Sequence, residues 1–252
     1  MKHIIYFLLL FSCVTRAGNG TELPQFDAAN ELYKKEKYRE AIQAYETILS
    51  TKKHSADVYF NLANAYYKTH QIAPAIYNYE KALLLAPNNK DIKTNLEFAK
   101  KMTIDDIKPT NKVGFAKSID TLTSSFHYDT WAKILIGLSV LFLVFFIGYY
   151  FSQKSIYKRL FFVGMFIVPF LIAIGFAAAF SEKTLYNNEK PAIIFAESTA
   201  LKSEPRENAA DVAQLHEGTK VMVLESVDQW KKVQLANEIE GWIAKESIKE
   251  IK

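Results

Sequence analysis

Hydrophobic and polar positions divide the chain into two polar arms joined by a pair of apolar segments. Segments 134–151 and 160–180 contain no Asp, Glu, Lys or Arg. As helices they would be about 27 and 31 Å long, enough to cross the hydrocarbon core of a bilayer. Buried core helices are the alternative, but uncharged runs of this length favour membrane spans at 132–151 and 160–180.

The short loop 152–159 between these segments is basic, with Lys154, Lys158 and Arg159. Positive charge in a short loop marks the cytoplasmic side of a membrane. The sequence therefore predicts a hairpin with its tip in the cytoplasm and both arms on the other side. The apolar segments 134–151 and 160–180 place no Asp, Glu, Lys, Arg or His inside the bilayer, which argues against ion or proton transport.

Segment 1–17 has the pattern of a secretory signal peptide. A basic head at 1–3 precedes an apolar run at 4–11, and Thr15–Ala17 offers a small-residue cleavage site. The run is too short for a third span. Together with the loop charge, it predicts a two-pass inner-membrane protein with both soluble domains in the periplasm.

The single cysteine, Cys13, lies at the end of this signal. Segment 10–13 resembles a lipoprotein signal, which makes Cys13 a candidate lipidation site, although Phe11 fits that signal poorly. Removal with the signal peptide is the alternative. The mature chain would then have no cysteine for a disulfide, a thiol nucleophile or a metal site.

The N-terminal arm contains an internal sequence repeat. Segment 38–46 aligns with segment 72–80, so that Tyr45 corresponds to Tyr79. This 34-residue period, two amphipathic helices per unit and alanines at helix crossings resemble the tetratricopeptide repeat (TPR). The resemblance implies an α-helical TPR solenoid over residues 22–102, with two repeats and a capping helix. The second copy matches the family at Tyr59, Leu62, Ala63, Tyr66, Ala75, Tyr79, Ala82 and Pro87.

Ligands of TPR proteins usually lie on the concave surface formed by the first helix of each repeat. The resemblance places eight candidate partner-binding residues there: Phe26, Asn30, Tyr33, Lys34, Phe60, Asn64, Tyr67 and Lys68. The Asn and Lys positions resemble a clamp for a peptide's terminal carboxylate, whose side chains donate hydrogen bonds. Phe26 stands where that clamp uses lysine and a third repeat is missing, so peptide or protein contact is the broader expectation. Such a short array predicts support from a partner or from self-association.

Residues 103–131 are expected to form a juxtamembrane connector. Asp105 and Asp106 precede an Ile-Lys-Pro segment. A helix start or a solvated linker explains these two carboxylates better than acid–base chemistry does.

Residues 190–252 change to short β-rich runs separated by turn-forming residues, which predicts about five strands in a closed or nearly closed barrel. Segments 200–205, 212–221 and 241–243 resemble a bacterial SH3-like domain, whose members often bind cell-wall peptides. The resemblance implies a small all-β SH3-like barrel. Val221, Val223, Val233 and Leu235 alternate with polar neighbours and are expected in its core.

Trp230 and Trp242 are the candidate partner-binding residues of this arm, because aromatic side chains supply large contact area. Completing the barrel core is the alternative role for both. His216, beside Glu217 and Gly218, is most simply a turn residue.

Charge and motif content exclude several classes of function. The chain has 31 basic and 27 acidic residues and a net charge of +4, without a basic tract outside the hairpin loop, which argues against nucleic acid binding. Its five histidines are scattered, and no phosphate loop or dinucleotide fingerprint is present. We therefore expect no catalytic site, no metal site and no cofactor.

The order of signal, TPR arm, connector, hairpin and SH3-like arm resembles the BatE family of Bacteroidetes aerotolerance (Bat) operons over the whole chain, including segment 215–221. This resemblance implies a multidomain inner-membrane protein beside membrane proteins with von Willebrand A domains and a MoxR-type ATPase. The expected function is a non-catalytic scaffold for protein–protein interaction in the envelope, anchored in the lipid bilayer. The alternative is a cell-wall sensor that binds peptidoglycan peptides through the SH3-like domain.

Overall fold

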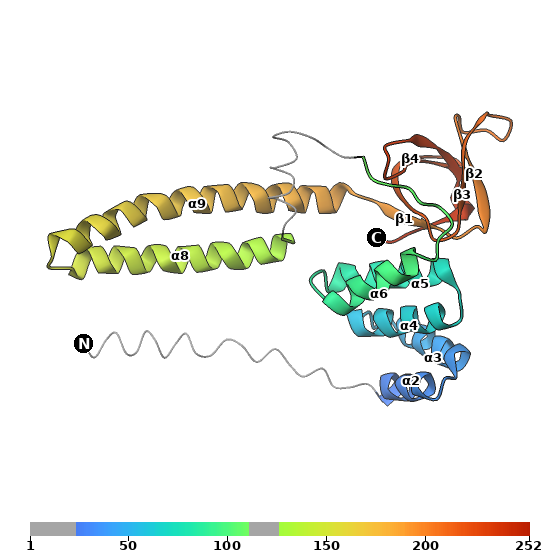
Figure 1. Ribbon diagram of the computed structural model, residues 1–252, viewed down its shortest axis with the longest axis horizontal. Helices are drawn as coiled ribbons and strands as arrows, with labels where there is room; N and C mark the ends of the chain where they lie inside the picture. The colour runs from blue at the N-terminus through green and yellow to red at the C-terminus, as the bar shows by residue number, and fades with distance from the viewer. Residues whose placement is uncertain (1–23, 111–125) are drawn as a thin grey trace.

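The computed structural model describes residues 24–110 and 126–252. It contains a helical array, a long two-helix hairpin and a curled β-sheet (Figure 1). The expected signal peptide and Cys13 lie outside the described residues.

Five helices stack in antiparallel succession in the N-terminal arm (Figure 1). Polar side chains fix the start of two of them: the Ser55 hydroxyl accepts the Val58 amide, and the Asn89 side chain accepts the Asp91 and Ile92 amides. The helices are α2 (Pro24–Lys34), α3 (Tyr38–Ser50), α4 (Ala56–Lys68), α5 (Ile72–Leu85) and α6 (Lys90–Lys100).

The repeat period recurs in the backbone and in the packing of the array. Glu36 and His70, one period apart, both adopt positive φ, at 59° and 58°, in the turns that separate paired helices. Ala29 and Ala63 are fully buried, so neighbouring helices approach closely at both. Repetition in sequence thus corresponds to repetition in structure.

Helices α8 (Tyr128–Phe151) and α9 (Ser155–Asn188) form a hairpin that extends away from both other parts (Figure 1). Both are long and apolar enough to span a membrane. Within their apolar windows 0% of α8 and 11% of α9 is buried, unlike the core helices of a soluble protein. The two helices approach closely at Gly164, where an added Cβ would lie 2.3 Å from the Phe145 ring.

The hairpin differs from its sequence prediction at both ends. Only residues 152–154 are non-helical at the tip, because α9 already begins at Ser155, within the loop expected over 152–159. A solvated helical turn carries Lys158 and Arg159 without penalty. Helix α9 also passes through Pro169 and continues to Asn188, well beyond the expected end of the span at Phe180.

The C-terminal arm is one seven-stranded sheet in the order β3-β2-β6-β5-β4-β1-β7, with every pair antiparallel. The expectation of about five strands was too low, because the sheet also contains β3 and β7 at its two edges. Strands β3 and β7 are its edges, so the order does not show a closed barrel. The strands are β1 (Pro191–Ile194), β2 (Ser198–Lys202), β3 (Asp211–His216), β4 (Lys220–Val227), β5 (Trp230–Gln234), β6 (Glu240–Ala244) and β7 (Ile248–Glu250).

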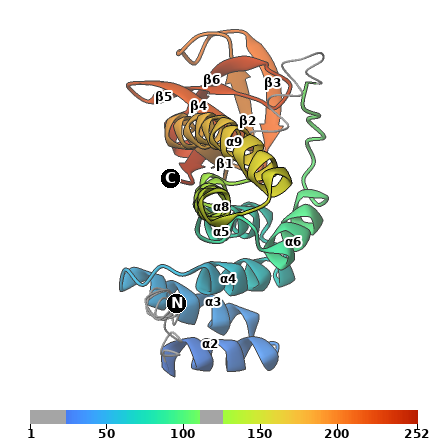
Figure 2. The ribbon, with the colours of Figure 1, turned by 90° about the vertical axis from the view of Figure 1, so that its left-hand side faces the viewer.

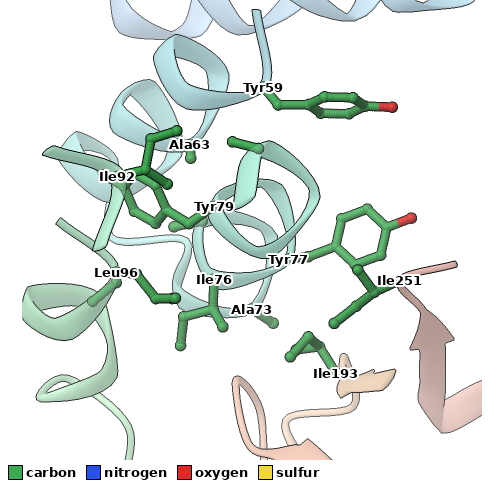
Figure 3. Close-up of a cluster of buried hydrophobic side chains, with 13 residues drawn as sticks. Tyr59, Ala63, Ala73, Ile76, Tyr77, Tyr79, Ile92, Leu96, Ile193 and Ile251 are labelled. Carbon is green, nitrogen blue, oxygen red and sulfur yellow. The ribbon is translucent and has the colours of Figure 1, made fainter. Parts of the chain in front are cut away.

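The sheet domain docks on helix α5 of the array. Ile193 and Ile251, both fully buried, join the apolar cluster of Ile76 and Tyr77 (Figure 3). The Phe195 ring meets the Tyr77 ring edge-on at 5.6 Å. The support expected for the short repeat array therefore comes from the chain's own C-terminal arm.

Candidate partner-binding surfaces

A hollow of about 250 Å³ opens on the face formed by the first helix of each pair. It brings together four of the eight residues predicted there: Tyr33, Asn64, Tyr67 and Lys68. Tyr79, Asn95 and Phe98 complete its lining. Aromatic walls with an amide and an ammonium group at one place form a surface that suits an extended peptide.

Two matched hydrogen-bond triads hold the asparagines of this face. The Asn64 side-chain oxygen accepts the Tyr79 hydroxyl at 2.6 Å and the Asn95 amide at 2.9 Å. In the first repeat Asn30 accepts Tyr45 at 2.7 Å and Asn61 at 2.9 Å.

The triad leaves Asn64 with donors for a ligand. Its oxygen accepts two hydrogen bonds, and its side-chain nitrogen makes none to the described residues. An amide in this state can donate to a carboxylate but cannot easily turn to accept. The triad is therefore a structural element that also orients a donor toward the hollow.

The other four predicted residues lie outside the lining of the hollow. Phe26 and Phe60 pack against Tyr45 and Tyr79, with ring centroids 6.1 and 6.0 Å apart. Asn30 belongs to the first triad, and Lys34 lies on the surface.

Lysines at equivalent repeat positions have different electrostatic surroundings. The Lys34 ammonium lies 2.8 Å from the Glu31 carboxylate, which raises the pKa of Lys34 through their hydrogen bond and charges. Lys68 lines the hollow, and none of the described carboxylates lies within ion-pair distance of it. Lys68 is thus the better placed of the two to bind an incoming anionic group.

Three lining residues escaped the sequence prediction of this site, and for Asn95 and Phe98 the signal was present. Asn95 lies one period after Asn61, so the repeat continues into the helix that was interpreted only as a polar cap. Phe98 lies one period after Asn64, which is the matching sequence signal, and its side chain is 51% exposed on that helix.

Trp230 and Trp242 lie half-buried on one face of strands β5 and β6. Trp242 pairs in register with Lys232 and with Lys202 of β2, and Trp230 shares the face of Lys232 by strand alternation. The buried core of the domain consists of other residues, including all four that were predicted: Ala192, Ile194, Leu201, Leu215, Val221, Val223, Val233, Leu235, Ile243 and Ile248.

The expectation that Asp105 lies in a solvated linker is wrong. Its side chain is only 9% exposed, and its carboxylate accepts the His216 amide at 2.8 Å, the His216 ring nitrogen Nδ1 at 2.8 Å and the Thr219 hydroxyl at 2.6 Å. Burial raises the pKa of Asp105, but these hydrogen bonds together hold it below its usual value. His216 is the last residue of β3 rather than part of the turn.

Segment 216–220 contacts the helical arm or the connector at four of its five positions. Besides His216 and Thr219, Lys220 pairs with Glu80 of α5 at 2.8 Å. Gly218 has φ +84°, and an added Cβ would lie 2.9 to 3.1 Å from Thr103, Ile72 and Ile76. The segment therefore serves as the docking element between the two arms.

Within residues 24–110 and 126–252, no group of three or more His, Cys, Asp and Glu side chains is arranged to hold a metal ion. The hollow is lined by Tyr, Phe, Asn and Lys side chains, residue types that suit contact with peptides or proteins.

Comparisons with protein families agree with this architecture. A TPR repeat model matches residues 29–69, a tetratricopeptide repeat model matches residues 56–89, and a bacterial SH3 domain model matches residues 197–249. A comparison with curated proteins finds none that matches the chain. The chain therefore contains TPR repeats and a bacterial SH3 domain, joined through two helices long and apolar enough to cross a membrane.

Proposed function

We propose that this chain is a non-catalytic scaffold, anchored in the inner membrane by its hairpin, that holds protein partners in the cell envelope. TPR repeats and bacterial SH3 domains are interaction modules, and both lie at the same end of the hairpin (Figure 1). The order of the parts supports a place in a Bat/MoxR-associated aerotolerance or envelope-stress complex. Its partners would then be membrane proteins with von Willebrand A domains.

The hollow of the repeat array is the observation that best supports this proposal. Its ligand would be an extended segment with a carboxylate, held by the Lys68 ammonium and the Asn64 amide while apolar side chains contact Tyr67 and Phe98. Charge-assisted hydrogen bonds of this kind fix orientation, and the aromatic walls supply contact area.

The basic tip and the apolar flanks of the hairpin support the topology. The tip and the adjoining first turn carry Lys154, Lys158 and Arg159, whereas both arms attach at the opposite end. With a cytoplasmic tip, both arms would be periplasmic.

A charge reversal in the hollow tests the proposal. Tagged full-length protein would be purified from native membranes in mild detergent, and its partners identified by mass spectrometry. We expect Lys68→Glu to deplete the membrane proteins recovered with wild type. Lys34→Glu, at the equivalent place outside the hollow, should retain them. Equal recovery with both variants would rule out the hollow as the site of contact.

A second candidate function is recognition of peptidoglycan peptides by the SH3 domain. The face of Trp230 and Trp242 favours it, because both side chains lie outside the domain core beside Lys202 and Lys232. Binding of full-length protein to purified sacculi, lost in Trp242→Ala with an unchanged circular dichroism spectrum, would support this function. Unaltered binding in that variant would reject the tryptophan face.

A further inference from the structure

The connector after α6 runs alongside the sheet domain before the chain enters the hairpin (Figures 1 and 2). It contacts the domain at three points. Asp105 binds His216 and Thr219, Ile107 packs against the core cluster, and the Thr110 amide donates to the Ala236 carbonyl at 3.2 Å. These contacts extend over segment 105–110 of the connector.

The contacts alternate along the connector. Asp105 and Ile107 face the domain, while the side chains of Asp106 and Lys108 are 83% and 82% exposed and pair with each other at 3.4 Å. Period-two alternation is the pattern of an extended peptide laid on a surface.

The domain provides three hydrogen-bond donors for the carboxylate. One backbone amide, one imidazole nitrogen and one hydroxyl converge on Asp105 from two positions of segment 216–220, His216 and Thr219. The Asp105 carboxylate is only 9% exposed and accepts three hydrogen bonds. A flexible tether would not need contacts this specific.

The side chain two residues later meets apolar surface. Ile107 packs against the cluster that contains Leu235, and Ala236 next to it provides the carbonyl that receives Thr110. Recognition thus combines a charge, an aliphatic side chain and one backbone hydrogen bond.

We propose that residues 105–110 are an intramolecular ligand in a peptide-binding groove of the SH3 domain. The groove would also take a partner protein's extended segment in which Asp is followed two residues later by a branched aliphatic residue. A tethered segment is present at an effective concentration of order mM, so a partner must displace it or bind after its release. This inference concerns a surface distinct from the hollow of the repeats and does not depend on it.

Peptide binding to the full-length protein in detergent tests this inference. The probe is a fluorescein-labelled peptide with the sequence of residues 103–110, followed by fluorescence anisotropy. Asp105→Asn combined with Ile107→Ser vacates the groove, and we expect peptide affinity about tenfold or more above that of wild type. Asp106→Asn combined with Lys108→Ser changes the exposed side of the connector and should match wild type.

Two further measurements establish where the peptide binds. Adding Thr219→Val to the vacated variant should abolish the gain, and a peptide with Asn in place of the first Asp should not bind. If the double variant does not fold by circular dichroism, the isosteric Asp105→Asn alone is titrated with the same two peptides. A folded variant that shows no gain, or that binds both peptides equally, would overturn the inference and reduce the connector to a structural tether.

Discussion

Asn64 has a structural role and a proposed binding role, because its side chain closes a triad inside the array and also lines the hollow. The same triad occurs at Asn30 without a place in the hollow. Comparing the two positions therefore separates the contribution of the triad to stability from the contribution of Asn64 to binding.

Replacing Asn64 by alanine should destabilise the protein. The Tyr79 hydroxyl and the Asn95 amide both lose their acceptor, and we expect a loss of about 2 kcal/mol or more in the free energy of unfolding. Chemical denaturation in detergent, followed by far-UV circular dichroism, measures it. A double-mutant cycle with Tyr79→Phe should show a non-additive coupling. Strict additivity would mean that the triad does not act as a unit.

Asp105 should make stability depend on acidity. Because its pKa in the folded protein is below its usual value, its stabilising effect is present above about pH 4 and is lost as pH falls through the lower folded pKa. Asp105→Asn should therefore be less stable than wild type at pH 6, and the gap should narrow toward pH 2.5. Denaturation midpoints across this range measure the gap, with Asp106→Asn as the exposed control. A gap independent of pH would contradict the assignment.

Sequence reasoning at this scale reached residues that belong to the repeat but not contacts between distant parts of the chain. The TPR resemblance predicted Asn64 and Lys68 on one surface, and both line the hollow. Nothing local to Asp105 indicates its partner, because His216 lies far along the chain and the two meet only after both arms fold. A contact of that separation has no signature in periodicity or composition.

At the scale of elements, the turn between β3 and β4 holds the two arms together. Gly218 combines a positive φ with close contact to Ile72 and Ile76 of α5. A side chain there would strain the backbone and push the turn away from the helix.

Gly218→Ala should weaken the docking of the sheet domain. We expect a loss of about 1–3 kcal/mol in the free energy of unfolding, together with faster proteolysis of the connector. Gly137→Ala is the matched control, since an added Cβ at Gly137 of α8 has no neighbour within 4 Å. Equal stability of both variants would show that the turn adapts.

Hydrophobic patterning predicted whether a segment is a helix or a strand, but not the residues at which it begins and ends. Charge ended the expected spans near Phe151 and Phe180, whereas helix α9 continues through polar residues to Asn188 because backbone hydrogen bonding does not require apolar side chains. Strand β7 was not predicted, because a strand of three residues has too short a pattern for alternation to reveal.

The whole molecule has two ends, with both arms at one end of the hairpin and the basic tip at the other (Figure 1). If the hairpin crosses a bilayer, every residue of both arms lies on one side. This arrangement gives a direct test of topology.

Single cysteines introduced into a Cys13→Ser background should react with a maleimide according to the side of the membrane on which they lie. Ser50→Cys in α3 and Glu207→Cys in the sheet domain should both be labelled by a membrane-impermeant maleimide added to cells with a permeabilised outer membrane. Lys154→Cys at the tip should be labelled only after lysis of the inner membrane. Labelling of the tip in intact cells, or protection of either arm, would refute the hairpin topology.

Helix α9 passes without a break from the hairpin tip to Asn188, and only Glu189 and Lys190 separate it from β1. Lys252 at the chain end secures this joint, since its ammonium lies 3.7 Å from the centre of the Tyr186 ring and donates to the Glu189 carbonyl. The helix is roughly 51 Å long, so if it moves as one body a tilt of about 10° at its tip would displace the far end by roughly 9 Å. If the hairpin crosses a membrane, a neighbouring protein that presses on it there would thereby reorient the SH3 domain and the repeats docked on it.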